Sequence, residues 1–411
     1  MQVDIAIVGA SVTGSAVATL AGEHGMSVAL VEQRDRETLQ ADRRMAPVPL
    51  WALEESRLPV GEVIRVPTRL HLVAGSERTT VGTPDCVMLE HGALEAALLE
   101  RALTGGARLL ERTRAVGLAP HGDGVRLADG SVIHARFVID ASGANGVALL
   151  GERAVLPEDV ASIAHETRRI GDRRLADAYL DAIGAERGES IVLLAPCGPG
   201  SLVVVRVDED ARTLSFDALT FGDADQRGDH RRPTARAAIR RVARGSSWLG
   251  DILAEDAQHV VLGGLRGRFS AGNVALAGGA AGATRPGIGG AYAFELLSAR
   301  ILVDTLASDG DLTRYERRVR SRFADSQHRD ATFARGFRML DEADLAAMIR
   351  SGAIGEALVA GVLDQRIARW PLLRFGMAAA LRSARATAGR ALDASSLLHG
   401  SSLRTTDGGR G

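Results

Sequence analysis

The chain has 411 residues, a formal net charge of −1 and two cysteines, Cys86 and Cys197. This length suffices for two domains. The balanced charge argues against a nucleic-acid partner. The two isolated cysteines argue against a disulfide framework and a metal site, and they fit a reducing cytoplasm. All fifty basic residues are arginine, so lysine Schiff-base chemistry and a lysine-containing phosphate loop are excluded.

Residues 3–34 have the pattern of a strand, a tight turn, a helix and a second strand. The first apolar run breaks at Gly9, small residues lead to Gly14, and the second apolar run ends at Glu32. A diphosphate needs bare backbone N–H groups at a helix start, and an acid at the strand end accepts the ribose hydroxyls. We expect a dinucleotide to be bound by Gly9, Ser11, Val12, Thr13, Gly14, Glu32, Gln33 and Arg34.

Two arginines, Arg43 and Arg44, follow in a charged loop. They could fold back over the diphosphate or remain solvated loop charges, and the sequence leaves both interpretations open. Beyond them, alternation predicts a strand pair over residues 63–81. An apolar segment at 86–89 then leads into residues 91–103, whose apolar spacing predicts a core-facing helix. Asp-Gly turns predict hairpins near residues 121–124 and 129–130, before a strand over residues 137–140.

Residues 151–261 differ from the preceding part of the chain in their pattern of apolar and charged residues. Strand-like segments at 190–195 and 202–207 alternate with charge-rich stretches at 168–180 and 231–244 that we interpret as helices. Residues 269–290 repeat the pattern of residues 3–34. An apolar strand runs into a glycine-rich loop, and Pro286 precedes a long helix. This arrangement offers a second helix start with unshielded N–H groups, although the glycines could serve tight packing alone.

From Asp311 onward the chain reads as helical with arginine-rich faces. Residues 366–398 predict a basic amphipathic helix that could touch a membrane or a lipophilic substrate, or pack on its own domain. The tail, residues 399–411, is expected to be disordered.

Three motifs now stand in order: GASVTG with Glu32 and Arg34, VIDASG at 138–143, and NVALAGGAAGATRPGIGG at 273–290. Together they resemble the FAD-dependent monooxygenase superfamily of the para-hydroxybenzoate hydroxylase type, with its geranylgeranyl reductase, lycopene cyclase and halogenase relatives, over residues 1–330. The resemblance implies an α/β fold. A Rossmann-like FAD-binding domain would comprise residues 1–65, 87–150 and 262–330, an inserted β-sheet substrate domain residues 66–86 and 151–261, and a helical region residues 331–411.

The resemblance also implies residue roles. Glu32 would hold the adenosine ribose, Val116 would border the adenine, and the glycine-rich loop would face the flavin ring. The further cofactor contacts it implies are Asp140, Gly279, Pro286, Gly287, Ile288, Gly289 and Gly290. The chain departs from the family where Gly279 replaces an aspartate and His91 replaces an arginine. His91 and Arg285 are the catalytic candidates.

The leading functional expectation is a monooxygenase that acts on a small hydrophobic or natural-product-like substrate through a flavin C4a-hydroperoxide. NAD(P)H would be a transient reductant, or a partner reductase would supply reduced flavin. The halogenase branch needs a lysine and a W-x-W-x-I-P segment, and the chain has neither. Two alternatives stay open: a flavin-dependent reductase or non-redox cyclase of an isoprenoid or polyene, and a degenerate flavin fold that only binds.

Overall fold

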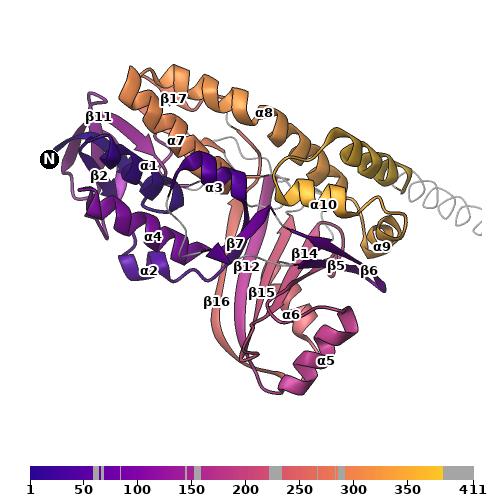
Figure 1. Ribbon diagram of the computed structural model, residues 1–411. Coiled ribbons are helices and arrows are strands. Elements are labelled where there is room, and N and C mark those ends of the chain that lie inside the picture. The colour runs from indigo at the N-terminus through magenta and orange to yellow at the C-terminus, as the bar shows by residue number, and fades with distance from the viewer. Residues whose placement is uncertain are drawn as a thin grey trace, which may run out of the picture.

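The structure is a computed structural model that describes residues 1–58, 64–65, 69–83, 85–143, 146–151, 159–221, 234–265, 267–282, 284–285 and 292–382. It is a mixed α/β fold with two large sheets and a small one between them (Figure 1). None of the described helices combines the length and apolarity needed to cross a bilayer.

The first sheet is built around β1. Its path is β17-β18-β11-β1-β2-β8, and β1 runs parallel to β2 and β11, which runs parallel to β18. The antiparallel strands β9 and β10 extend from β11. The bounds are β1 Gln2–Val8, β2 Val28–Val31, β8 Arg108–Leu110, β9 Ala115–Leu118, β10 Gly124–Leu127, β11 Val132–Asp140, β17 Ser270–Ala271 and β18 Val274–Leu276.

Both faces of β1 are covered, which is why residues 5–8 are uniformly apolar. Ile5 and Ile7 belong to the core beneath three helices, whereas Ala6 and Val8 belong to a second cluster with β9 and β10. The three helices are α1 Val12–Glu23, α4 His91–Thr104 and α7 Tyr292–Ser308. The predicted strand–turn–helix–strand of residues 3–34 is therefore confirmed.

The second sheet has the order β16-β12-β15-β14-β13-β5-β6 and is antiparallel except where β13 meets β5. One face packs against α5 and α6, and the other faces the C-terminal helices (Figure 1). The bounds are β5 Arg69–Ala74, β6 Glu77–Gly82, β12 Val160–Ile170, α5 Arg173–Ile183, β13 Ser190–Leu194, β14 Ser201–Val207, β15 Thr213–Phe221, α6 Ala235–Ala243 and β16 Leu249–Val261.

A small sheet joins the two large ones. Its central strand β7 pairs with β3 and β4, and α3 follows β3 directly. The bounds are α2 Arg36–Gln40, β3 Met45–Pro49, α3 Leu50–Ser56, β4 Ile64–Arg65 and β7 Cys86–Glu90. β7 leads straight into α4, so this sheet fixes the position of His91, the first residue of that helix.

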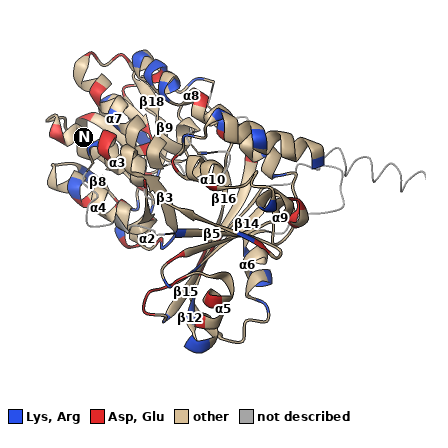
Figure 2. Ribbon diagram, turned by 45° about the vertical axis from the view of Figure 1, so that its right-hand side comes forward, with Lys and Arg blue, Asp and Glu red and all other residues tan. Residues whose placement is uncertain are grey.

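The helical region after residue 311 consists of α8 Leu312–Phe337, α9 Glu342–Arg350, α10 Glu356–Leu363 and a further helix over residues 369–382. Helix α8 spans the molecule, because Phe323 packs in the core of the first sheet and Phe337 in that of the second. Arginines lie along its outer side (Figure 2). The expected disorder of residues 399–411 concerns a segment outside the described residues.

One sequence-based expectation for the second sheet was wrong in part. The stretch predicted as a helix over residues 168–180 begins as the end of β12, and α5 starts only at Arg173. Strand β12 lies between β15 and β16 and gains hydrogen bonds on both edges. Tertiary pairing therefore overrides the helical propensity of its charged residues. The other predicted helix, 231–244, is described from residue 234 and matches α6.

Candidate functional site

Backbone packing at glycine brings the three glycine-containing motifs together. Gly9 adopts φ +100°, and a Cβ there would lie 2.5 Å from the carbonyl oxygen of Ala141 in the second motif. Gly278 of the third motif adopts φ +57°, and a Cβ there would lie 2.2 Å from Oγ1 of Thr13. Side chains at either glycine would separate segments that the sheet order places side by side. The motifs therefore form one structural unit.

The turn before α1 leaves the positive end of the helix available. A Cβ on Gly14 would lie 1.9 Å from the carbonyl oxygen of Gly9, so only glycine permits this tight turn. Ser11 is the N-cap, its side chain makes no capping hydrogen bond, and the first turn of α1 carries no acid. An uncompensated helix N-terminus with free N–H groups is suited to an anion such as a diphosphate.

Glu32 is a buried carboxylate prepared to accept hydroxyl groups. Its Oε2 accepts from the Ala10 N–H at 2.9 Å, and its Oε1 accepts from the Arg34 backbone N–H and Nε, both at 3.0 Å. Burial alone would raise the pKa of Glu32, but these hydrogen bonds and the Arg34 charge outweigh it and lower the pKa below its usual value. The side chain is therefore ionised, and each oxygen retains acceptor capacity.

A cavity of about 1060 Å³ connects this region to the second sheet. Pockets for one small ligand are roughly 300–1,000 Å³, so this one can hold a large cofactor or a cofactor with a small substrate. The predicted residues that line it are Gly9, Ser11, Glu32, Gln33, Arg34, Arg44, His91, Val116 and Gly279. The predicted contacts Pro286, Gly287, Ile288, Gly289 and Gly290 lie outside the described residues, but Thr284 and Tyr292 on either side of them line the same cavity.

The second sheet lines the cavity with the polar residues Ser190, Arg206, Asp217, Gln258 and His259 and with a larger set of apolar side chains. We call the part bordered by the apolar set the apolar half. Side chains of that sheet form one wall, and α8, α10 and the turn between α9 and α10 form another. The wall residues include Leu70, Leu72, Ile163, Val192, Leu194, Leu202, Val204, Leu219, Val260, Phe333, Phe337, Ile354, Leu358, Val359, Val362 and Leu363. Such a surface favours a hydrophobic molecule.

Arg43 and Asp140 are predicted cofactor contacts that do not line the cavity. Arg43 is an exposed loop charge paired with Glu90, whereas Arg44 turns inward. Asp140 is buried, and its carboxylate accepts from the Ser142 N–H at 3.1 Å and the Ser142 hydroxyl at 2.5 Å. The carboxylate therefore stabilises the turn after β11. The residues that follow it, Ala141, Ser142 and Gly143, line the cavity in its place.

Val12, Thr13 and Gly14 lie just behind the cavity wall. The side chains of Val12 and Thr13 are buried, with 1% and 3% of their surface exposed. Their predicted cofactor contact can therefore come only through the backbone N–H groups of the first helical turn.

Arg285, predicted as a catalytic candidate, is a buried residue whose side chain joins two helices. Its guanidinium is buried and donates to Asp330 through Nε and through Nη2, each at 2.7 Å. A third bond, from Nη1 to the carbonyl oxygen of Val362, is also 2.7 Å. The side chain ties α8 to the end of α10 and is not among the described residues that line the cavity.

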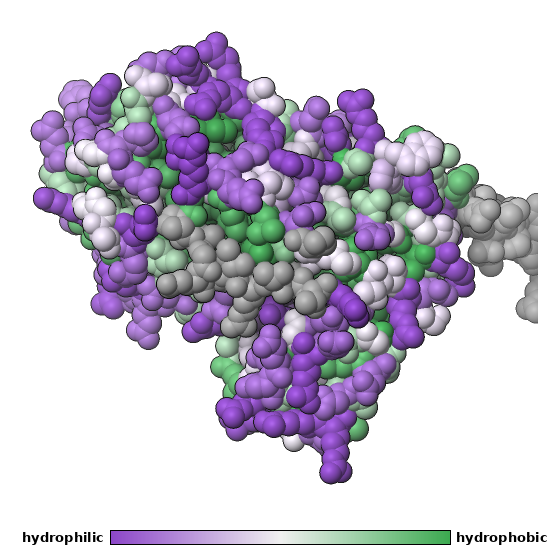
Figure 3. All heavy atoms as spheres, in the orientation of Figure 1, coloured by the Kyte–Doolittle hydropathy of each residue, from purple (hydrophilic) through white to green (hydrophobic). Residues whose placement is uncertain are grey.

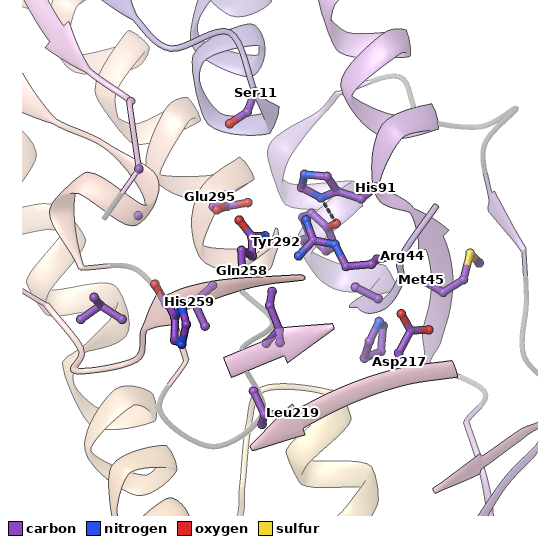
Figure 4. Close-up of a pocket in the computed structure, with 18 of the residues that line it drawn as sticks. Ser11, Arg44, Met45, His91, Asp217, Leu219, Gln258, His259, Tyr292 and Glu295 are labelled. Atoms are coloured by element: carbon purple, nitrogen blue, oxygen red, sulfur yellow. Dashed lines mark hydrogen bonds between the residues drawn. The ribbon is translucent and has the colours of Figure 1, made fainter. Parts of the chain in front are cut away.

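His91 lies in a polar cluster at the cavity (Figure 4). Its Nδ1 hydrogen-bonds to the Tyr292 hydroxyl, and its Nε2 lies 3.1 Å from Oε1 of Glu95 and 3.9 Å from Oδ2 of Asp42. Burial alone lowers the pKa of His91, but the hydrogen bond and the charge of Glu95, with that of Asp42, outweigh it and raise the pKa. The imidazole therefore holds its proton toward Glu95.

Arg44 connects this cluster to the second sheet. Its Nε donates to Oδ1 of Asp42 at 2.8 Å. In the amide orientation that satisfies both partners, the side-chain oxygen of Gln258 on β16 accepts from the two terminal nitrogens of Arg44 at 2.5 and 2.9 Å. The contact links the segment directly before β3 to the second sheet beside the cavity.

Sequence reasoning missed Glu295, which lines the cavity from the first turn of α7 (Figure 4). No other described side chain forms a hydrogen bond or ion pair with its carboxyl group. Burial raises its pKa to about 7, against the lowering effect of His91 and with the support of the Glu95 charge. A signal was present in the sequence, because Glu295 is the single charge in the apolar run 291–299. The described residues contain no cluster suited to a metal ion.

The family model described as "Lycopene cyclase protein" matches residues 4–158. No curated protein matches the sequence. Among solved structures, a geranylgeranyl bacteriochlorophyll reductase-like protein from Thermoplasma acidophilum is similar with a TM-score of 0.72 at 15% identity. That match covers 91% of this chain and 95% of the other.

Two flavin enzymes share the fold. The flavin-dependent brominase Bmp2 has a TM-score of 0.66 at 12% identity, with 95% of this chain and 100% of the other covered. A probable FAD-dependent monooxygenase from Pseudomonas aeruginosa has a TM-score of 0.53 at 18% identity, with 92% and 99% covered. The sheet order and these neighbours agree, so the chain has the fold that these reductase-like, brominase and monooxygenase structures share, and its N-terminal part is similar to the lycopene cyclase family model.

Proposed function

We propose that this protein is an FAD-dependent oxidoreductase that acts on a hydrophobic substrate. The observation that supports this most directly is that one continuous cavity borders both the Glu32–Ser11 region and the apolar side chains of the second sheet. A cofactor bound at the first region would extend toward a molecule held at the second. Monooxygenation is the first candidate reaction, with NAD(P)H as reductant or with reduced flavin supplied by a partner.

The donors and acceptors of this chain fit FAD. Glu32 would accept from the two ribose hydroxyls, the start of α1 would face the diphosphate, and Val116 would border the adenine. Gly279 lines the cavity and would lie beside the ribityl chain, where it would provide no carboxylate. When bound, FAD supplies two-electron redox chemistry that the protein side chains lack.

The apolar half of the cavity would orient the substrate and exclude water. Leu219 and Val260 from the sheet and Phe333 and Phe337 from α8 line it. Exclusion of water strengthens the electrostatic interactions inside the site. At the polar end of the cavity, His91, Glu95, Tyr292 and Glu295 would hold the exchangeable protons.

Glu295 favours a second candidate, the reduction of a carbon–carbon double bond. Such a reduction adds a hydride to one carbon and a proton to the other, and NAD(P)H supplies only the hydride through the flavin. With a pKa of about 7, Glu295 carries a proton on a large fraction of molecules at neutral pH. We assign to Glu295 the role of proton donor to the substrate in this reaction, and its carboxylate is reprotonated from water in each cycle.

The visible spectrum of the purified protein with added FAD tests the proposal. We expect a bound oxidised flavin that NADH or NADPH bleaches under anaerobic conditions. Oxygen uptake that matches NAD(P)H oxidation in the presence of an aromatic substrate would support monooxygenation, whereas anaerobic turnover of a polyprenyl alcohol would support reduction. A protein that stays colourless with FAD would contradict the proposal and support a binding-only flavin fold.

Replacing Glu295 with glutamine tests the protonation of this carboxyl group without a substrate. In the unmodified protein, the infrared carbonyl band of a protonated carboxyl group is expected to disappear as the pH rises, with a midpoint at about 7. The raised pKa means that the proton is bound below this pH and lost above it. The band should be absent from Glu295→Gln.

The matched control is Glu54→Gln, since Glu54 is exposed on α3. This variant should retain the titrating band. A band that persists in Glu295→Gln, or a midpoint near the ordinary glutamate value in the unmodified protein, would remove Glu295 from the proposed role.

A further inference from the structure

The helix over residues 369–382 has two apolar faces. Phe375 and Ala379 on its inner face are buried, with 1% and 6% of their surface exposed. The opposite face is solvent-exposed and carries the large apolar side chains Trp370 (67% exposed), Leu373 (51%), Met377 (57%) and Leu381 (63%). Their spacing of three, four and four residues places them on one side of the helix. We call these four residues the outer stripe.

The outer stripe is an unusual concentration of exposed apolar surface. Elsewhere in the described chain, large exposed apolar side chains occur singly or as the adjacent pair Ile252 and Leu253 on β16. Figure 3 shows hydrophobic and weakly polar side chains gathered at the end of the molecule where this helix lies. Contiguous apolar surface of this kind marks an interaction site in soluble proteins.

The charged side chains of the helix segment that carries the stripe are all positive. Residues 365–382 contain four arginines and no acidic residue, in a chain whose net charge is −1. Arg366 is engaged with Glu55 and Arg382 with Asp344. Arg369 and Arg374 are exposed, and no ion pair to either is formed by a described residue. An apolar stripe that ends in tryptophan and is flanked by arginines complements an anionic membrane surface.

We propose that the outer stripe with Arg369 and Arg374 docks on the surface of an anionic lipid bilayer. The apolar side chains would enter the boundary between headgroups and acyl chains, and the guanidinium groups would pair with lipid phosphates. The helix would lie in the plane of the surface while its inner face stays packed on the protein. Docking of this kind fits with the finding that no described helix is suited to span a membrane.

The inner face places this surface close to the cavity. The ring of Phe375 packs on that of Phe333 with centroids 4.9 Å apart, and Phe333 lines the apolar half. One layer of side chains thus separates the docking helix from the cavity. If the proposed function holds, a substrate dissolved in the membrane would be concentrated next to its binding site, but membrane docking itself does not depend on that function.

The test is cosedimentation of the full chain with vesicles. We expect binding to vesicles of phosphatidylcholine with phosphatidylglycerol, and much weaker binding to phosphatidylcholine alone. Trp370→Ser/Leu373→Ser/Met377→Ser should lower the partition coefficient more than roughly tenfold. Arg369→Gln and Arg374→Gln should each lower it roughly fivefold, an effect that vanishes at high salt.

The control is Leu175→Ser/Ile252→Ser/Leu253→Ser, which removes exposed apolar side chains elsewhere and should bind as the unmodified protein does. Circular dichroism checks that every variant is folded. The proposal is overturned if the unmodified chain stays in the supernatant with anionic vesicles, or if the outer-stripe variant still sediments. It is also overturned if light scattering shows that the stripe holds two copies of the chain together in a dimer that does not bind lipid. None of these results depends on flavin binding, which the visible spectrum reports separately.

Discussion

Replacing Gly14 with valine is expected to give a folded protein that has lost FAD. A Cβ at this position would lie 1.9 Å from the carbonyl oxygen of Gly9, so the turn must open before any side chain fits. That movement displaces the N–H groups at the start of α1. We expect affinity for FAD to fall at least roughly a hundredfold, which corresponds to about 2.7 kcal/mol, as measured by equilibrium dialysis and the visible spectrum.

A companion substitution separates loss of the site from loss of the fold. Ser11 lines the cavity and makes no capping bond, so Ser11→Leu fills the proposed diphosphate path without touching the Gly9–Gly14 contact. It should weaken FAD roughly tenfold while the melting temperature is unchanged. The control Gly82→Ala, where a Cβ meets nothing within 4 Å, should retain full flavin content. Normal flavin binding by both Gly14→Val and Ser11→Leu would show that FAD does not bind at the start of α1.

Replacing Arg285 with methionine is expected to lower the free energy of unfolding by about 3 to 5 kcal/mol. The substitution leaves the buried Asp330 carboxylate without its two 2.7 Å partners, and an uncompensated buried charge is strongly destabilising. Urea unfolding monitored by tryptophan fluorescence measures the effect, because the indole of Trp51 donates to the carbonyl oxygen of Asp364 just after α10.

The double variant Arg285→Met/Asp330→Leu provides the comparison. It removes both charges and should recover most of the lost stability, since well-packed apolar replacements of buried ion pairs are often neutral. A catalytic role for Arg285 predicts the reverse pattern, with normal stability in the single variant and no recovery of turnover in the double variant.

The sequence predicted the first sheet better than the second. Residues 5–8 and 28–31 are apolar because both faces of their sheet are covered, and the turn from Gly9 to Gly14 is a local steric requirement. Strand β12, by contrast, ends with residues 168–170, which the sequence predicts as the start of a helix. Its conformation depends on β15 and β16, which come about 50 and 90 residues later, and no local pattern encodes such pairing.

Site residues that belong to a local sequence motif could be predicted. Residues that come together only through the tertiary fold could not. Glu32 follows from its place at a strand end. The cluster of His91, Glu95, Tyr292 and Glu295 joins the first two turns of α4 to the first turn of α7, and some 200 residues separate these helices. The inward turn of Arg44 and the outward turn of Arg43 depend on Asp42 and Glu90, so the loop sequence alone left both interpretations open.

The placement of β18 bears on how the chain folds as it leaves the ribosome. β18 is the parallel neighbour of β11, yet residues 141–273, which include most of the second sheet, are translated between them. A nascent chain therefore leaves the end of β11, residues 138–140, without its β18 partner during that interval. Unpaired strand edges are prone to intermolecular pairing. Chaperone protection of this edge during synthesis is accordingly expected to raise the yield of folded protein.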